Sequence, residues 1–269
     1  MNYKNLKVEK KDHVLRVKLN RPEVRNAFDE VLIAELQDVF SGPAAGKTKG
    51  YEDVRAVVLQ GEGPSFCGGG DLKWMKASLD LSHEENIEDC RRLTHMFLTM
   101  DRCPRPVIGV VHGYAIGGGV GLVSVCDHVI AADTTQFSLS EVKLGLIPAC
   151  IGPFVIGKIG ASHARSLFVS GERATAEKAM RIGLVHEVVK ESELESRTNT
   201  VLQRILEGGP NAIEAAKYLI HTLTRDLNRE PFSESLNFAA AELAQLRVQP
   251  EAQEGLRAFL DKRVPTWRK

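Results

Sequence analysis

Short apolar and mixed runs in the first half of the chain have the periodicity of strands. Residues 13–19 (HVLRVKL) alternate apolar and polar side chains, which predicts a strand with one face in solvent. Residues 54–59 and 106–112 are almost continuously apolar, as buried strands are. Residues 129–132 predict a further short strand.

Helical patterns separate these strands. Residues 27–40 place their apolar side chains on one stripe. A second helix is predicted to begin at Ser82, because Ser82 and Glu85 form an S-x-x-E capping box, and to end before Pro104. Residues 120–126 predict a short buried helix.

Helical periodicity dominates the second half of the chain. It covers residues 162–169, 175–182, 194–206, 212–223 and 232–262. Only residues 184–189 have an extended pattern there. We therefore predict an α/β core over residues 1–200, followed by a helical C-terminal region over residues 201–269.

Composition and charge exclude several classes of protein. The 269 residues are 43% hydrophobic and 26% charged, as in an ordinary soluble globular protein. Lys plus Arg and Asp plus Glu number 35 each, and this balance predicts no attraction to nucleic acid or to an anionic membrane. No apolar run approaches the roughly 18 residues of a membrane span. The first residues resemble neither a secretory nor an organelle-targeting signal. Five cysteines without a C-x-x-C pair indicate reduced thiols and predict a cytoplasmic protein.

Several familiar motifs are incomplete. Residues 42–48 resemble a phosphate-binding loop, but the glycine spacing is one residue short and no long apolar strand precedes it. The dinucleotide fingerprint G-x-G-x-x-G and the nucleophile elbow G-x-S-x-G are absent from the sequence. His83-Glu84 and His186-Glu187 lack the second histidine of a zinc-binding helix, so we predict no metal site.

Two glycine clusters are the first candidates for chemistry. Residues 61–72 and residues 113–122 each follow a predicted buried strand, and the second cluster leads into a predicted helix. Glycine lets a ligand approach the backbone closely, and the first N–H groups of a helix have no partner within it. One N–H group from each cluster could thus converge on a single oxygen atom. Each cluster alone is equally typical of a tight turn.

Glu141 is the third candidate. It lies within residues 137–148, among Leu and Ile side chains that would bury it. Burial raises the pKa of a carboxyl group, and a raised pKa suits a side chain that both takes and returns a proton. Alone, a glutamate in such a turn is equally typical of a solvated surface position.

The three segments in this order resemble the crotonase superfamily, also called the enoyl-CoA hydratase/isomerase family. The similarity extends from Leu19-Asn-Arg-Pro-Glu-Val-Arg-Asn-Ala-Phe28 to Ala176-Glu-Lys-Ala-Met-Arg-Ile-Gly-Leu-Val185. The resemblance implies a spiral of ββα units with a helical C-terminal oligomerisation region that builds a homotrimer or a dimer of trimers. It implies acyl-CoA thioester substrates and no cofactor, since coenzyme A is part of the substrate.

The resemblance also implies roles for particular residues. The N–H groups of Gly70 and Gly118 match the family's oxyanion hole, which holds the thioester oxygen. The positions that match the coenzyme A-binding segments are Arg25, Phe66, Gly70, Asp71, Leu72, Lys73 and Lys262. Lys262 matches a cation that a neighbouring subunit often offers to the 3′-phosphate. The positions that match the acyl pocket are Trp74, Met75 and Gly121.

The number of catalytic carboxylates bears on the reaction. The best-known hydratases have two glutamates; Glu141 matches one of them, and Gly121 stands where the other would be. Single-glutamate members include Δ3,Δ2-enoyl-CoA isomerases and some hydratases of branched, carboxylated enoyl-CoAs. This chain is most similar to the methylglutaconyl-CoA hydratase type, a step of leucine breakdown. We expect the gap at Gly121 to hold the water or a substrate branch, and Lys73 or Lys76 to meet a distal carboxylate.

Two alternatives remain open from the sequence. One is the isomerase, in which a single glutamate shuttles one proton. The other is a non-catalytic acyl-CoA-binding or RNA-binding protein, because one relative of this branch also binds RNA. A basic cluster is formed by Lys7, Lys10 and Lys11, but it contains no aromatic side chains of the kind on which RNA-binding proteins stack bases.

Overall fold

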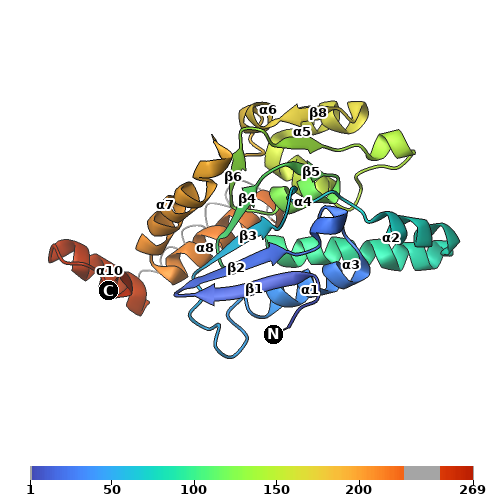
Figure 1. Cartoon of the computed structure of the whole chain (residues 1–269). Coiled ribbons are helices and arrows are strands. Elements are labelled where there is room, and N and C mark those ends of the chain that lie inside the picture. The colour runs from blue at the N-terminus through green and yellow to red at the C-terminus, as the bar shows by residue number, and fades with distance from the viewer. Residues whose placement is uncertain (1, 227–248, 269) are drawn as a thin grey trace.

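The computed structural model describes residues 2–226 and 249–268. A six-stranded sheet in the order β1-β2-β3-β4-β6-β9 forms its centre (Figure 1). The strands are β1 (Leu6–Lys11), β2 (Val14–Leu19), β3 (Ala56–Gly61), β4 (Val107–Val111), β6 (His128–Ala132) and β9 (Glu187–Val189). β1 and β2 pair antiparallel, whereas the other neighbouring strands pair parallel.

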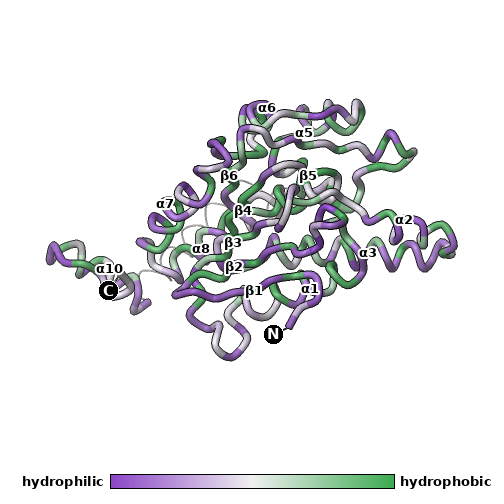
Figure 2. The backbone as a smooth tube through the Cα atoms, in the orientation of Figure 1, coloured by the Kyte–Doolittle hydropathy of each residue, from purple (hydrophilic) through white to green (hydrophobic). Residues whose placement is uncertain are grey.

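Alternate side chains of the central strands enter two separate cores. Val57 and Leu59 of β3 belong to a large core on one face of the sheet, which also contains residues of α1 (Glu30–Ser41), α3 (His83–Asp101) and α4 (Gly118–Ser124). Val58 belongs to a smaller core on the other face, together with Leu194, Val201 and Leu202 of α7 (Leu194–Glu207). Figure 2 shows the hydrophobic central strands within this enclosure of helices. Burial on both faces explains why β3 and β4 are continuously apolar.

A second, three-stranded sheet lies beside the first. It consists of β5 (Tyr114–Ile116), β7 (Gln136–Ser138) and β8 (Arg173–Thr175), in the order β5-β7-β8. Two helices flank β8 in the sequence: α5 (Gly152–Ser170), which kinks at Gly160, and α6 (Ala176–Arg181). The short α2 (Leu72–Ala77) precedes α3.

The C-terminal region contains α8 (Pro210–His221), a π-helical turn (Thr222–Asp226) and α10 (Pro250–Leu260). α10 lies at one extreme of the molecule, while α2 lies at the opposite extreme (Figure 1). The predicted helix over residues 232–262 falls partly outside the described residues. Within the described ranges, no helix is both long and apolar enough to cross a bilayer.

The α/β architecture and the helical C-terminal region are confirmed, but several bounds differ. The predicted division at residue 200 cuts through α7, whose buried side chains pack as one unit on the sheet. α1 begins at Glu30 rather than residue 27, because Phe28 is engaged in an isolated β-bridge with Gly70. α5 begins at Gly152, but its backbone is not helical at Gly160, and the predicted helix over residues 162–169 corresponds to the part of α5 after this break. The sequence did not predict β1, β5 or β8, since the last two have only three residues and β1 is mostly charged.

Candidate active site

The outer face of the three-stranded sheet forms the floor of a cavity of about 900 Å³. Paired residues of neighbouring strands point to the same face, and Ile116, Ser138 and Arg173 occupy one such row. All three line the cavity, as does Tyr114. The intervening residues Ala115, Phe137 and Ala174 are at most 1% exposed and pack into the core.

Gly70 forms part of the cavity wall through a parallel β-bridge with Phe28. The Phe28 N–H donates to the Gly69 carbonyl at 2.7 Å, and the Asp71 N–H donates to the Phe28 carbonyl at 2.8 Å. In this pattern the N–H of Gly70 itself points away from Phe28. Within residues 2–226 and 249–268, this N–H donates no hydrogen bond. It is therefore available to a ligand.

Gly118 supplies a second available N–H, at the first residue of α4. The preceding Gly117 has φ +51°, and its N–H donates to the Ser138 carbonyl at 2.8 Å, which ties the start of α4 to β7. The Gly118 N–H finds no acceptor in the part of the chain that the structure describes, as expected for the first turn of a helix. The ring of Phe28 lies directly against Gly118, so one residue contacts both glycines.

Glu141 lies beside the start of α4. It opens the 3₁₀ turn Glu141–Leu144, and its Oε1 is 3.0 Å from the point where a Cβ on Gly117 would be. Two features therefore require glycine at position 117: its positive φ, and the close approach of the Glu141 carboxyl group, which a Cβ would obstruct. Glu141 Oε2 is buried and has no hydrogen-bond partner among the described residues. Burial raises the pKa of Glu141, an effect that a backbone hydrogen bond partly opposes.

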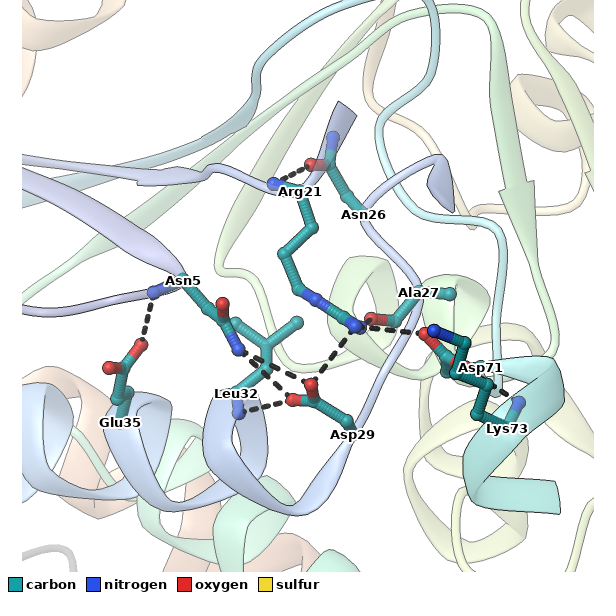
Figure 3. Close-up of polar contacts among 9 residues, drawn as sticks. All are labelled: Asn5, Arg21, Asn26, Ala27, Asp29, Leu32, Glu35, Asp71 and Lys73. Atoms are coloured by element: carbon teal, nitrogen blue, oxygen red, sulfur yellow. Dashed lines mark hydrogen bonds and ion pairs between the residues drawn. The ribbon is translucent and has the colours of Figure 1, made fainter. Parts of the chain in front are cut away.

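A buried ion-pair network supports this wall of the cavity (Figure 3). Arg21 contacts Asp29 at 3.0 Å and Asp71 at 2.9 Å, and it also donates to the Ala27 carbonyl. Asp29 caps α1 through the Leu32 N–H at 2.8 Å. Arg21 therefore joins the start of α1 to the residue that follows Gly70.

Asp71 in turn caps α2, because its carboxylate accepts the Lys73 N–H at 2.7 Å. Burial opposes ionisation of Asp71, but the Lys73 N–H and the Arg21 guanidinium outweigh it and lower the pKa of Asp71. Arg21 was not among the predicted site residues, although it lies within the segment 19–28 that resembles the crotonase superfamily. An arginine and two aspartates far apart in sequence gave no local signal.

Four cations line the cavity: Arg25, Lys73, Lys143 and Arg173. The guanidinium groups of Arg25 and Arg173 lie 6.0 and 5.9 Å from the centre of the Tyr114 ring. Two carboxylates, Glu23 and Asp71, also line the cavity, and Asp71 is already paired with Arg21. The arrangement favours a ligand that carries negative charge.

Among the predicted ligand-binding residues, Arg25, Gly70, Asp71, Leu72 and Lys73 line the cavity. Trp74 and Met75 of α2 lie against Gly70, with Met75 Cγ 3.3 Å and Trp74 Cε3 3.7 Å from the position of a Cβ there.

Phe66, Gly121 and Lys262 are not among the residues that line the cavity. Phe66 is 0% exposed and packs in the core, so its side chain cannot contact a ligand in the cavity. The gap expected at Gly121 is filled, because a Cβ there would overlap Ile151 and lie 2.9 Å from the ring of Phe97. Lys262 follows α10 in the sequence, and α10 lies at the opposite extreme of the molecule from α2 (Figure 1).

A second hollow, of about 920 Å³, lies along α3 and is lined mainly by the outer side chains of that helix. None of Gly70, Gly118 and Glu141 lines it, whereas Gly70 lines the first cavity, so we do not regard this hollow as the active site. Among the described residues, no group of three or more His, Cys, Asp or Glu side chains could hold a metal ion.

Comparison with known proteins agrees with the geometry. The family model described as enoyl-CoA hydratase/isomerase matches residues 9–269. A protein of Alternaria alternata named enoyl-CoA hydratase ACTT6 is 35% identical over 80% of this chain and 69% of its own length. The (E)-benzylidenesuccinyl-CoA hydratase of Thauera aromatica is 30% identical over 97% of this chain and 98% of its own. The crystal structure of an enoyl-CoA hydratase from Shewanella pealeana superimposes with a TM-score of 0.91 at 32% identity, covering 98% of this chain and 96% of that one.

Proposed function

The chain belongs to the enoyl-CoA hydratase/isomerase family, the crotonase superfamily, and from this premise we propose that it is an enoyl-CoA hydratase that adds water across the double bond of a 2-enoyl-CoA thioester. One observation carries the proposal. A buried carboxyl group with an unpartnered oxygen, Glu141, lies beside a helix start whose first N–H is unpaired.

The N–H groups of Gly70 and Gly118 are proposed to hold the thioester oxygen. Negative charge develops on that oxygen when water adds at Cβ, so fixed donors stabilise the transition state more than the substrate. One such donor contributes about 2.7–4 kcal/mol in other enzymes. The location of Gly118 at the first residue of α4 adds the positive end of the helix dipole.

Glu141 is proposed to carry out both proton transfers. Its carboxylate accepts a proton from water as the oxygen adds at Cβ, and the resulting carboxylic acid returns a proton to Cα on the same face. A syn addition of this kind needs only one carboxyl group if it reaches both atoms. The raised pKa of Glu141 supports this role, because a carboxyl group that exchanges protons readily near neutral pH must be less acidic than usual.

We further propose that the acyl group is branched or carries a distal carboxylate, as in methylglutaconyl-CoA. Lys73, Lys143 and Arg173 line the cavity, and Arg173 pairs in the sheet with Ser138, whose carbonyl holds Gly117 beside Glu141. Lys76 is not among the cavity-lining residues. The relative named (E)-benzylidenesuccinyl-CoA hydratase supports a substrate with a succinyl unit.

Assembly as a homotrimer or a dimer of trimers, and a cytoplasmic location, stay predictions. α10, which Lys262 follows in the sequence, and α2 lie at opposite extremes of one chain (Figure 1). If Lys262 binds the 3′-phosphate, it must therefore do so in the site of another copy.

The test is the Glu141→Gln variant, assayed with crotonyl-CoA and 3-methylglutaconyl-CoA. Loss of the acid/base group should lower kcat by roughly 10²–10⁴-fold. Glu88→Gln is the matched control, since Glu88 is an exposed residue of α3 whose ion pair with Arg91 spans 3.8 Å. Activity of Glu141→Gln within a few-fold of the parent would remove Glu141 from the mechanism.

Two further assays separate the alternatives. If the wild-type protein converts 3-enoyl-CoAs to 2-enoyl-CoAs without hydrating them, it is the Δ3,Δ2-enoyl-CoA isomerase. If the Arg173→Gln and Lys143→Gln variants lose activity equally toward crotonyl-CoA and 3-methylglutaconyl-CoA, neither cation binds a distal carboxylate.

A further inference from the structure

Two cysteines lie against each other outside the candidate active site. Cys90 is exposed on α3, and the half-buried Cys150 lies two residues before α5. The Cys150 thiol donates a hydrogen bond to the carbonyl oxygen of Cys90 at 3.8 Å. They are 60 residues apart in the sequence, so the fold alone brings them together.

The other three cysteines are shielded from solvent. Cys67, Cys103 and Cys126 are 0%, 1% and 2% exposed and pack in the large core. Burial raises the pKa of Cys67 and Cys126 to about 12 and that of Cys103 to about 11. Since the thiolate is the reactive form, these three residues are inert in the folded protein. Thiol chemistry is confined to Cys90 and Cys150.

We propose that Cys90 and Cys150 form a redox-sensitive dithiol site, which a peroxide oxidises to an intramolecular disulfide. The Cys90 thiolate attacks one oxygen of hydrogen peroxide, breaks the O–O bond and becomes a sulfenic acid, while the released hydroxide takes a proton to form water. The Cys150 thiolate then attacks this sulfur, the S–S bond forms, and the sulfenic oxygen leaves as a second water. Two thiols lose two electrons, and hydrogen peroxide is reduced to two waters.

The surroundings of the pair set its reactivity and its effect. Partial burial and the neighbouring Cys150 raise the pKa of Cys90, so oxidation should be faster in mildly alkaline than in neutral solution. The disulfide would join α3 to the segment between the turn that carries Glu141 and α5. Ile151, the next residue, packs on Gly121 of α4, so the bond would fasten a segment that also contacts the helix that begins at Gly118.

The experiment oxidises the folded full-length protein with hydrogen peroxide, alkylates the remaining thiols and digests it with trypsin without reduction. We expect a cross-linked pair of peptides, residues 77–91 and residues 144–158. Thiols titrated after denaturation should fall from five to three per chain, and dithiothreitol should restore all five. The Cys90→Ser and Cys150→Ser variants should each lose the cross-link. The double variant should keep its three remaining thiols under the same oxidant.

Three results would overturn the proposal. These are five titratable thiols after oxidation, overoxidation of Cys90 without a bond to Cys150, and a disulfide that links two chains, seen as a dimer on a non-reducing gel. Because peptide mapping needs no substrate, its outcome is independent of the proposed hydratase activity.

Discussion

Replacement of Arg21 by Met tests whether the buried ion pairs hold the wall that carries Gly70. The side chains of Arg21, Asp71 and Asp29 are only 14%, 5% and 19% exposed. Methionine retains much of the apolar volume of arginine but leaves both carboxylates without their cation. Removal of one partner of a buried pair typically costs about 3–5 kcal/mol of unfolding free energy.

The structure places the expected cost near the lower end of that range. Asp29 still accepts the Leu32 N–H and Asp71 still accepts the Lys73 N–H, each at under 3 Å. These bonds keep both carboxylates partly satisfied after the cation is gone. We therefore expect a loss of about 3 kcal/mol in the free energy of unfolding near neutral pH.

The loss of unfolding free energy in Arg21→Met should become smaller at acidic pH. The Lys73 N–H and Arg21 outweigh burial and hold the pKa of Asp71 below its usual value in the folded protein. Its stabilising contribution is therefore fully present above the unfolded pKa of about 3.9, and is lost as the pH falls through the lower folded pKa. The difference between Arg21→Met and wild type should narrow below about pH 4.

Urea unfolding and steady-state kinetics check the prediction, with Arg16→Met as the matched control. Arg16 pairs with Glu195 at 2.8 Å, but the carboxylate is 60% exposed, so this change should cost less than about 1 kcal/mol. If Gly70 is an oxyanion donor as proposed, Arg21→Met should also lower kcat/KM toward the roughly 10²–10³-fold loss known for a missing donor, because Asp71 follows Gly70 and its N–H bonds to Phe28. Equal unfolding free energies for the two variants would refute the structural role of Arg21.

Three further predictions follow from single contacts. Gly121→Ala should destabilise the protein by about 1–3 kcal/mol in urea, because the added methyl group overlaps Ile151, and the further change Ile151→Ala should relieve that overlap. Burial raises the pKa of Glu141, so kcat/KM should fall on the acid side with an apparent pKa above that of an ordinary glutamate. An apparent pKa at the ordinary glutamate value would count against Glu141 as the base. Burial and nearby cations lower the pKa of His186 to about 4, so stability should decline from about pH 6.5, its unfolded pKa, down to about pH 4. His186→Gln should remove this decline in thermal unfolding.

Local patterns predicted the elements with many buried side chains. Residues 54–59 and 106–112 correspond to β3 and β4. Both faces of these strands are buried, so nearly every position is apolar and the strands stand out in the sequence. The Ser82–Glu85 capping box is present at the start of α3, since a cap is a contact between residues three apart. The three-residue strands β5 and β8 are too short for such a pattern. Where they begin and end is decided by their pairing with β7, which is distant in the sequence from β8.

The candidate site shows the same division between local and long-range information. Glycine clusters and a glutamate among leucines are local signals, and they identified residues 61–72, residues 113–122 and Glu141 as candidates. The resemblance to the crotonase superfamily then singled out Gly70 and Gly118 within the two clusters. The surroundings of Gly121 could not be predicted from the sequence, because they come from distant segments: Phe97 belongs to α3, and Ile151 directly precedes α5. A glutamate at Gly121 would need this packing to open. This packing supports the proposal that Glu141 alone carries out the proton transfers.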